Sequence, residues 1–349
     1  MAGVGTTIVA NDYNAIQIAI ASVLGQVTGG YGTALQSGQV LSTAKITSAQ
    51  WNDLQTDISN VNYHQLNTAP SYNGSPLTTA SNGGSVAYKG NPNTPPATKI
   101  RDADRAAYLA VANALANSSS STVGGVTYPG KFAQAPAGQF TTPTSGTFPV
   151  NSQRAAGWNG YVLNTVTLTF PSNQAAEYFF NAGSVFAITA KAEVGQTAVV
   201  GTKDYSWKTM LDNMGTITMG YRATTNSGAS GAGSGYGWTW FNANRGAAPV
   251  TIYKNTITGT YAPNEYDVNC SLNSSGNVFT FQIYFQDLSP NPNTTTWQGN
   301  PLVNPGTTYG PYGVDENITA VITSTINALY SSGGVSVAAY LPTVSATFP

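Results

Sequence analysis

The spacing of apolar residues changes once along this chain, and this change constrains the fold more than any other feature. In residues 8–24, apolar side chains recur every three or four positions, and the same helical spacing returns in 47–61 and in 98–117. From residue 161 onward, apolar residues instead alternate with threonines and other polar residues, as they do in half-buried strands. The sequence therefore predicts a helical region followed by a strand-rich region.

Residues typical of helix ends flank the first two predicted helices. Asn11 and Asp12 offer N-cap oxygens to the first helix, and Gly25 is expected to end it in a left-handed conformation. The segment Thr47-Ser-Ala-Gln50 matches a capping box at the start of the second helix. Each helix carries one apolar face, so we expect the two helices to bury these faces together.

The second half of the chain is expected to form eight strands and two short helices. The helices are predicted at 173–180 and 204–214, and the segment 273–277 fits a hairpin loop between two strands. The predicted fold class is α+β, with an N-terminal α-helical region followed by a mainly antiparallel β-sandwich or jelly-roll-like domain. The strands are expected at 161–170, 185–192, 215–224, 250–261, 266–272, 278–286, 318–326 and 335–341.

Local composition divides the chain into three parts. Residues 1–125 are expected to form a helical docking or oligomerisation region, from which an extended polar arm at 67–97 departs. Residues 126–150 are rich in proline and glycine, and they are interpreted as a linker. Residues 151–349 are assigned to the antiparallel β domain.

Charge is scarce in this chain, and this scarcity bears on its partners. Only 8% of the residues are charged and 41% are hydrophobic, whereas an ordinary globular chain is about 25% charged. A formal net charge of -1 gives little repulsion between copies, so we expect association into an oligomer. The 13 basic residues are scattered, which argues against nucleic acid as a partner.

No apolar run approaches the roughly 20 residues that cross a bilayer, so no membrane partner is expected. The first residues lack the basic and apolar regions of a secretory leader, so synthesis in a cytoplasm without processing is expected.

The sequence offers few groups for catalysis or metal binding. His64 is the only histidine and is expected near a helix end, and Cys270 is the only cysteine and is expected in a strand. Clustered histidines and cysteines, which zinc and iron sites require, are therefore not expected, and we predict no catalytic residue, no metal site, no cofactor and no enzyme. A hydrolase using paired carboxylates of the β domain is the weaker alternative, since such carboxylates also arise by chance.

An aromatic cluster follows the glycine-rich segment 226–235, and it is the main candidate binding site. Tyr236, Trp238, Trp240 and Phe241 lie within six positions of one another. If buried, these rings would form a strand of the β core; if exposed, they could stack on sugar rings or on a partner protein. Both interpretations remain open on the sequence alone.

Several segments together resemble virion structural proteins of tailed bacteriophages, especially of marine and cyanobacterial phages. The resemblance covers most of the chain, rests on general patterns, and carries no site residues across. The segments are Thr7-Ile-Val-Ala-Asn-Asp-Tyr-Asn-Ala-Ile16, Gly30-Tyr-Gly32, Ile46-Thr-Ser-Ala-Gln-Trp-Asn-Asp-Leu54, Tyr63-His-Gln65, Phe179-Phe-Asn-Ala-Gly183 and Trp207-Lys-Thr-Met-Leu-Asp-Asn-Met-Gly215.

The resemblance implies a non-catalytic structural subunit of the virion, made in the host cytoplasm, such as a neck, tail or fibre accessory protein. Its partners would be copies of itself and other virion structural proteins. The alternatives are a module that binds host-surface carbohydrate through the exposed aromatics, and a head decoration protein. We expect the assembly interface to involve the helical stripes and the histidine, namely Tyr13, Ile16, Trp51, Leu54 and His64.

Overall fold

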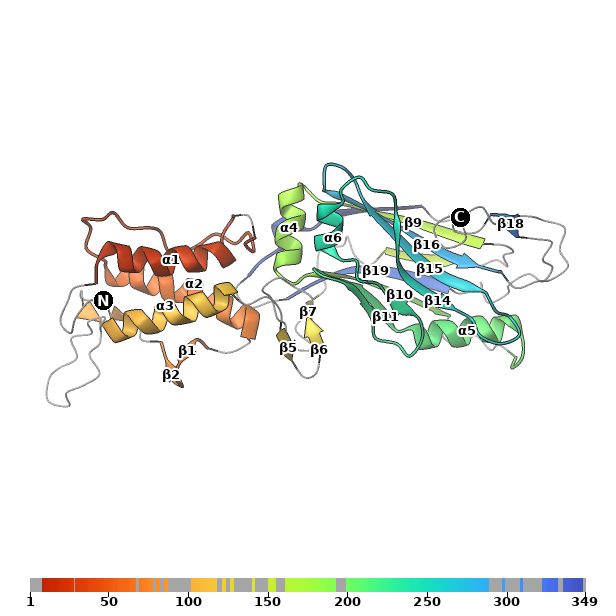
Figure 1. Ribbon diagram of the computed structural model, residues 1–349, viewed down its shortest axis with the longest axis horizontal. Coiled ribbons are helices and arrows are strands. Elements are labelled where there is room, and N and C mark those ends of the chain that lie inside the picture. The colour runs from red at the N-terminus through yellow and green to blue at the C-terminus, as the bar shows by residue number, and fades with distance from the viewer. Residues whose placement is uncertain are drawn as a thin grey trace. The chain divides into compact units, whose positions relative to one another are not determined.

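The computed structural model describes sixteen stretches of the chain (Figure 1). The predicted linker falls mostly outside them, and the predicted polar arm is described only in part. The stretches are 8–27, 29–66, 69–77, 80–81, 85–86, 102–117, 121–123, 126–128, 140–141, 150–154, 161–192, 199–288, 297–298, 308–309, 322–331 and 335–347.

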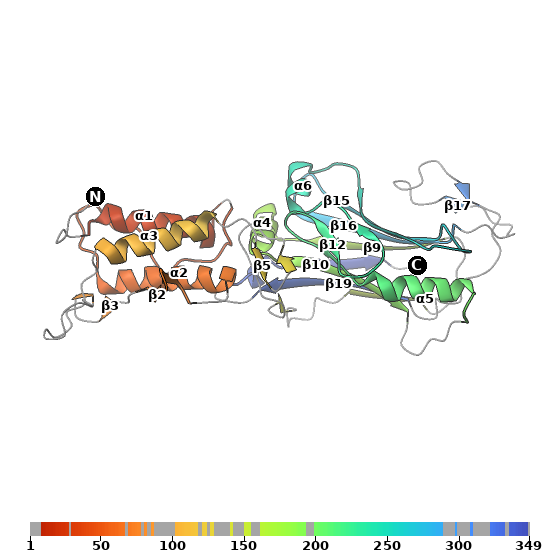
Figure 2. The same cartoon turned by 60° about the horizontal axis from the view of Figure 1, so that its bottom comes forward.

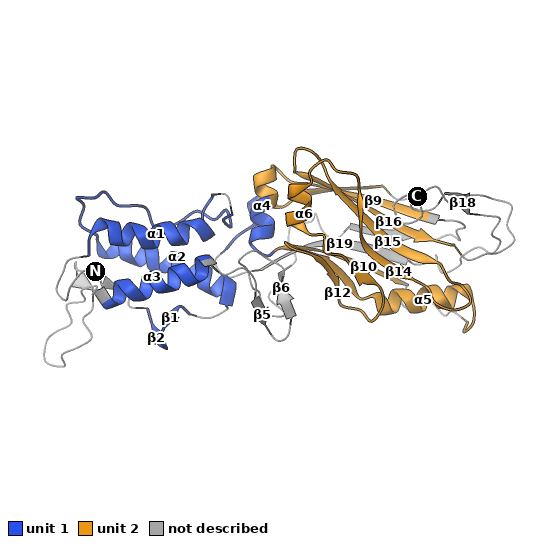
Figure 3. Cartoon of the chain, in the orientation of Figure 1, with its two compact units in different colours: residues 1–141, 177–183, 330–339 blue, residues 142–176, 184–329, 340–349 orange. Residues whose placement is uncertain are grey.

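The chain divides into two compact units (Figure 3). The helical unit comprises residues 1–141, 177–183 and 330–339, and the β unit comprises residues 142–176, 184–329 and 340–349. The predicted β domain, 151–349, includes 177–183 and 330–339, whereas in the structure both segments cluster with the helices.

Three helices form most of the helical unit, and they lie side by side in Figures 1 and 2. They are α1, Ala10–Leu24; α2, Ser48–Leu66; and α3, Asp102–Asn117. Trp51 of α2 lies between the other two helices, because its ring centroid is 6.2 Å from that of Tyr13 and 4.7 Å from that of Tyr108. The helical apolar spacing thus produces one shared core.

The predicted capping box of α2 is confirmed. The Gln50 N–H donates to Thr47 Oγ1 at 3.2 Å, and the Thr47 N–H donates to Gln50 Oε1 at 2.9 Å. The predicted caps of α1 are wrong in detail. Val9 is its N-cap residue, and Asp12 accepts from the Val9 N–H at 3.3 Å, while Asn11 lies inside the helix.

Gly25 ends α1, but with φ -71° it is not in the left-handed region. The physical reason for glycine is space, because a Cβ on this residue would lie 2.4 Å from the carbonyl oxygen of Ala21.

Two large antiparallel sheets make up most of the described part of the β unit. The first has the strand order β12-β11-β10-β19, and β8 also pairs with β19. The end of β19, at Tyr330 and Ser331, belongs to the helical unit and pairs there with β7. The strands are β7, Phe140–Thr141; β8, Val150–Arg154; β10, Val185–Ala192; β11, Thr216–Met219; β12, Thr224–Asn226; and β19, Ile322–Ser331.

The second sheet has the strand order β13-β14-β15-β16-β9-β20. Phe186 of the first sheet lies 6.1 Å from Phe279 and 6.0 Å from Phe281 of this sheet, centroid to centroid, so the two sheets pack face to face. The fold class is therefore α+β with a β-sandwich-like domain, as predicted. The strands are β9, Tyr161–Thr169; β13, Ala232–Gly233; β14, Val250–Thr256; β15, Glu265–Leu272; β16, Val278–Gln286; and β20, Thr343–Thr347.

Short elements complete the described part of the chain. Helices α4, Asn173–Asn181, and α5, Lys203–Met214, lie where the sequence predicts them, and α6 is Trp238–Ala243. A 3-10 helix spans Ala338–Tyr340. Short strands form hairpins at β1, Ser71–Tyr72, with β2, Ser75–Pro76; β3, Ala80–Ser81, with β4, Ser85–Val86; β5, Ser121–Val123, with β6, Val126–Tyr128; and β17, Trp297–Gln298, with β18, Thr308–Tyr309.

Most predicted strands are present, and two predictions are wrong. The hairpin loop at 273–277 is confirmed, since Asn273 Oδ1 accepts from the N–H groups of Asn277 and Val278, and Gly276 adopts φ 75°. The strand predicted at 335–341 is absent, because the chain forms its 3-10 turn there and the strand follows at Thr343–Thr347. The strand expected at 215–224 is interrupted between β11 and β12 by a turn closed from Gly220 N–H to Ala223 carbonyl.

Candidate functional site

The five residues predicted for the assembly interface all lie in the core of the helical unit. Tyr13, Ile16, Trp51, Leu54 and His64 are at most 1% exposed. The three helices bury their apolar stripes against one another, so no part of these stripes faces a partner. These five side chains are therefore not accessible on the surface of the helical unit.

His64 is part of the internal polar network of the helical unit. Its Nε2 lies 2.9 Å from the carbonyl oxygen of Ala182, and its ring meets that of Tyr31 edge-on at 4.8 Å. The neighbouring Gln65 donates to Tyr31 Oη at 2.9 Å. Complete burial raises the pKa of Tyr31 well above its usual value. These contacts explain His64 as a structural residue at the end of α2.

Residues 177–183 are bound to the glycine turn after α1 by polar contacts within the helical unit. Glu177 Oε1 accepts from the Gly29 N–H at 2.9 Å, and Asn181 Nδ2 donates to the Gly30 carbonyl at 3.0 Å. The Glu177 carboxylate thus binds a backbone amide of this turn.

The loop between α1 and α2 is fixed to both helices. The Asp57 carboxylate is fully buried and accepts from the N–H groups of Gln36 and Ser37 at 2.9 and 2.8 Å, and from Ser37 Oγ at 2.6 Å. On α1, Asn14 donates to the Val40 carbonyl at 2.9 Å and accepts from the Val40 N–H at 2.8 Å. This anchoring was not predicted from the sequence, because it depends on single polar residues within helices.

Among the described residues, most exposed large apolar side chains belong to the helical unit. Among the described residues, seven of the ten large apolar side chains that are exposed lie there, and Leu41 is the most exposed at 79%. Because Asn14 holds Val40 on α1, Leu41 is fixed beside that helix, and Ile18 follows Asn14 by one helical turn on the same face. The seven are Val9, Ile18, Val27, Leu41, Tyr63, Leu66 and Tyr72; the other three are Val199, Val200 and Tyr205.

The predicted aromatic cluster is split between the core and the surface. Trp238 and Phe241 are 2% and 1% exposed, and their rings lie 6.1 and 5.6 Å from that of Phe279. They belong to helix α6 and not to the expected strand. Tyr236 and Trp240 are half-buried, with ring centroids 4.6 Å apart. Only this second pair can offer ring surface to a ligand.

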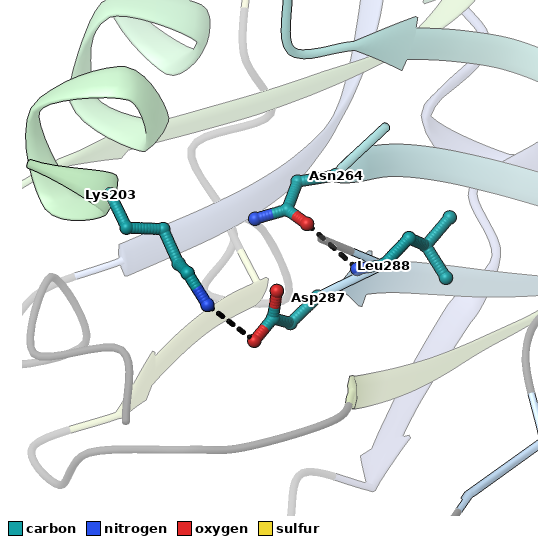
Figure 4. A network of polar contacts seen from close by, with 4 residues as sticks. All are labelled: Lys203, Asn264, Asp287 and Leu288. Atoms are coloured by element: carbon teal, nitrogen blue, oxygen red, sulfur yellow. Dashed lines mark hydrogen bonds and ion pairs between the residues drawn. The ribbon is translucent and has the colours of Figure 1, made fainter. Parts of the chain in front are cut away.

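The β unit also contains a buried polar cluster that the sequence analysis did not identify (Figure 4). Lys203 Nζ lies 2.8 Å from Asp287 Oδ2, and the Leu288 N–H donates to Asn264 Oδ1 at 2.7 Å. One feature of the sequence pointed to this cluster. Lys203 lies in the first turn of a helix, where its positive charge opposes the helix dipole unless a negative group is near.

Cys270 lies fully buried in β15, where burial raises the pKa of its thiol well above the usual value. Within the described stretches, no three histidine, cysteine, aspartate or glutamate residues gather in a group that could hold a metal ion. A search of those same stretches finds no helix with the length and apolar character needed to span a membrane. Comparisons with protein-family models, with curated proteins and with solved structures found no match to this chain.

Proposed function

We propose that this protein is a non-catalytic structural subunit of a tailed bacteriophage virion, a neck, tail or fibre accessory protein, and that it docks through the surface of its helical unit. The observation that carries the proposal is the concentration of exposed apolar side chains on that unit, in a chain with only 8% charged residues. Such side chains gain free energy when a partner covers them, at about 25 cal/mol per Å² of apolar surface.

The open edge of the second sheet supports the same proposal. Strand β20 is the last strand of that sheet, and within the described stretches no strand pairs with its outer edge. Four of its five side chains are exposed, and these four are threonine, serine or alanine side chains. Such small side chains leave the backbone of the edge strand accessible. A neighbouring subunit could add a strand there through backbone hydrogen bonds.

The test is to purify tailed phage particles from a host that produces this chain. Peptide mass spectrometry of density-purified particles and cryo-electron microscopy would then be combined. The proposal predicts that the chain is present at a fixed ratio to other particle proteins and occupies density at a regular position. Particles that lack the chain while it remains free in the lysate would contradict it.

One observation favours a second function, the binding of host-surface carbohydrate. Tyr236 and Trp240 form a partly exposed ring pair, and such rings can stack on sugar rings. Replacing both residues by alanine should abolish binding to host cells or glycans while leaving the oligomeric mass unchanged. Binding that survives the double replacement would exclude this function.

A further inference from the structure

A lysine, an aspartate and an asparagine converge inside the β unit (Figure 4). Lys203 is the first residue of α5, Asn264 directly precedes β15, and Asp287 directly follows β16. Because Glu265 pairs with Gln286 in the register of these two strands, Asn264 and Asp287 lie at the same end of neighbouring strands. Lys203 is 5% exposed, and the other two residues are fully buried.

The contact between Lys203 and Asp287 provides a path for proton transfer. Both groups are shielded from water, and the passage of one proton from Lys203 Nζ to Asp287 Oδ2 across their 2.8 Å contact removes both charges. The resulting amine has a free electron pair and is a nucleophile, as desolvated lysines are in enzymes that form covalent bonds through them.

The carboxamide of Asn264 is arranged as an electrophile. Its Oδ1 accepts a hydrogen bond of 2.7 Å from the Leu288 N–H. A donor at this oxygen polarises the carbonyl and stabilises the negative charge that develops there when a nucleophile attacks Cγ. In Figure 4, Lys203 Nζ points to the Asp287 carboxylate, and the Asn264 amide is drawn next to this pair with its nitrogen turned toward the side from which Lys203 comes.

We propose that Lys203 and Asn264 join in an intramolecular isopeptide bond, with Asp287 transferring the protons. The bond between Lys203 Nζ and Asn264 Cγ forms, and the bond between Asn264 Cγ and Nδ2 breaks. Asp287 takes two protons from Nζ, one after the other, and passes both to the departing nitrogen, which leaves as ammonium, so Asp287 returns to a carboxylate. No electrons are gained or lost, and no cofactor is required.

This bond would tie the start of α5 to the start of β15, which are far apart in the sequence. A covalent link of this kind restricts the unfolded chain, as a disulfide does, and it needs no oxidant. The inference stands independently of the proposed function, since it rests on the interior of the β unit alone.

The deciding experiment is the intact mass of the purified full chain, measured under denaturing conditions. The proposal predicts a mass lower than that of the sequence by one ammonia, and a proteolytic fragment in which the peptides of Lys203 and Asn264 are joined. A mass equal to that of the sequence would overturn it. A loss of one water, with the link at Asp287, would overturn the assignment of Asn264 as the electrophile.

Variants separate the roles of the three residues. Lys203→Met and Asp287→Asn should each restore the full mass of their sequences, while Lys254→Met should keep the loss of ammonia. Lys254 is the matched control, because it also forms an ion pair, with Glu265 at 2.6 Å, but is 40% exposed. Retention of the mass loss in Lys203→Met would overturn the proposal, and the wild-type mass decides the question if a variant fails to fold.

Discussion

The ring of Trp51 packs against that of Tyr108 at a centroid distance of 4.7 Å, which joins α2 to α3. Trp51 is 1% exposed, so its replacement by alanine should leave a large cavity in the helical unit. We expect a loss of about 3–5 kcal/mol in the free energy of unfolding, measured by denaturant titration with circular dichroism. Tyr63→Ala on the exposed side of the same helix is the control, and a similar loss there would contradict the account.

The stability of the helical unit should fall in alkaline solution because of Tyr13. Burial is the main cause that raises the pKa of Tyr13 from 10.0 to about 12, followed by the charges of Asp53 and Asp57. Between these two pH values the unfolded chain loses the phenol proton and the folded chain keeps it. The free energy of unfolding therefore declines as pH rises from 10 towards 12.

The measurement is denaturant unfolding at several pH values across this range. Tyr13→Phe removes the titrating group, together with the hydrogen bond from Tyr13 Oη to the Gln50 carbonyl. The variant should be less stable at neutral pH but should show a shallower decline above pH 10. An equal decline in both proteins would show that Tyr13 does not contribute.

Two glycines of the helical unit should respond in opposite ways to alanine. A Cβ on Gly25 would meet the Ala21 carbonyl oxygen at 2.4 Å, so Gly25→Ala should cost about 1–3 kcal/mol through local displacement. A Cβ on Gly38 meets nothing within 4 Å, so Gly38→Ala should leave stability unchanged or raise it by about 0.4–1 kcal/mol. Thermal unfolding of the two variants measures these changes in stability. Equal changes in both variants would show that the clash of the added Cβ is not the cause.

Loss of exposed apolar side chains on the helical unit should weaken association. Ile18→Asp combined with Leu41→Asp places two charges where the proposed partner would cover apolar side chains, so the variant should stay dissociated at concentrations where we expect the wild type to assemble. Val200→Asp is the matched control, because Val200 is 76% exposed but lies in the β unit. Sedimentation velocity measures the result, and equal dissociation in the control would argue against this surface.

The spacing of apolar residues was sufficient to predict the main helices and most strands. The helices α1 and α2 and the strands around the 273–277 loop follow directly from local periodicity and turn residues. The strand predicted at 335–341 failed because alternation of Val335 and Val337 reflects two buried side chains in an irregular segment. Local alternation of apolar residues alone does not distinguish a strand from an irregular segment with two buried side chains.

The candidate sites were predicted less well, because burial depends on contacts between distant residues. Trp51 and Tyr13 are apolar stripe residues whether they face a partner or a third helix, and the sequence did not show that α3 covers them. Similarly, Lys203 and Asp287 are 84 positions apart, and only the sheet and α5 together bring them into contact.

The most direct test of the central claim is the mass of the purified protein in solution, measured by light scattering. A structural subunit with an accessible apolar surface should form a discrete oligomer, with a mass that is a whole multiple of 36.2 kDa. A stable monomer of 36.2 kDa across the concentrations tested would contradict the account.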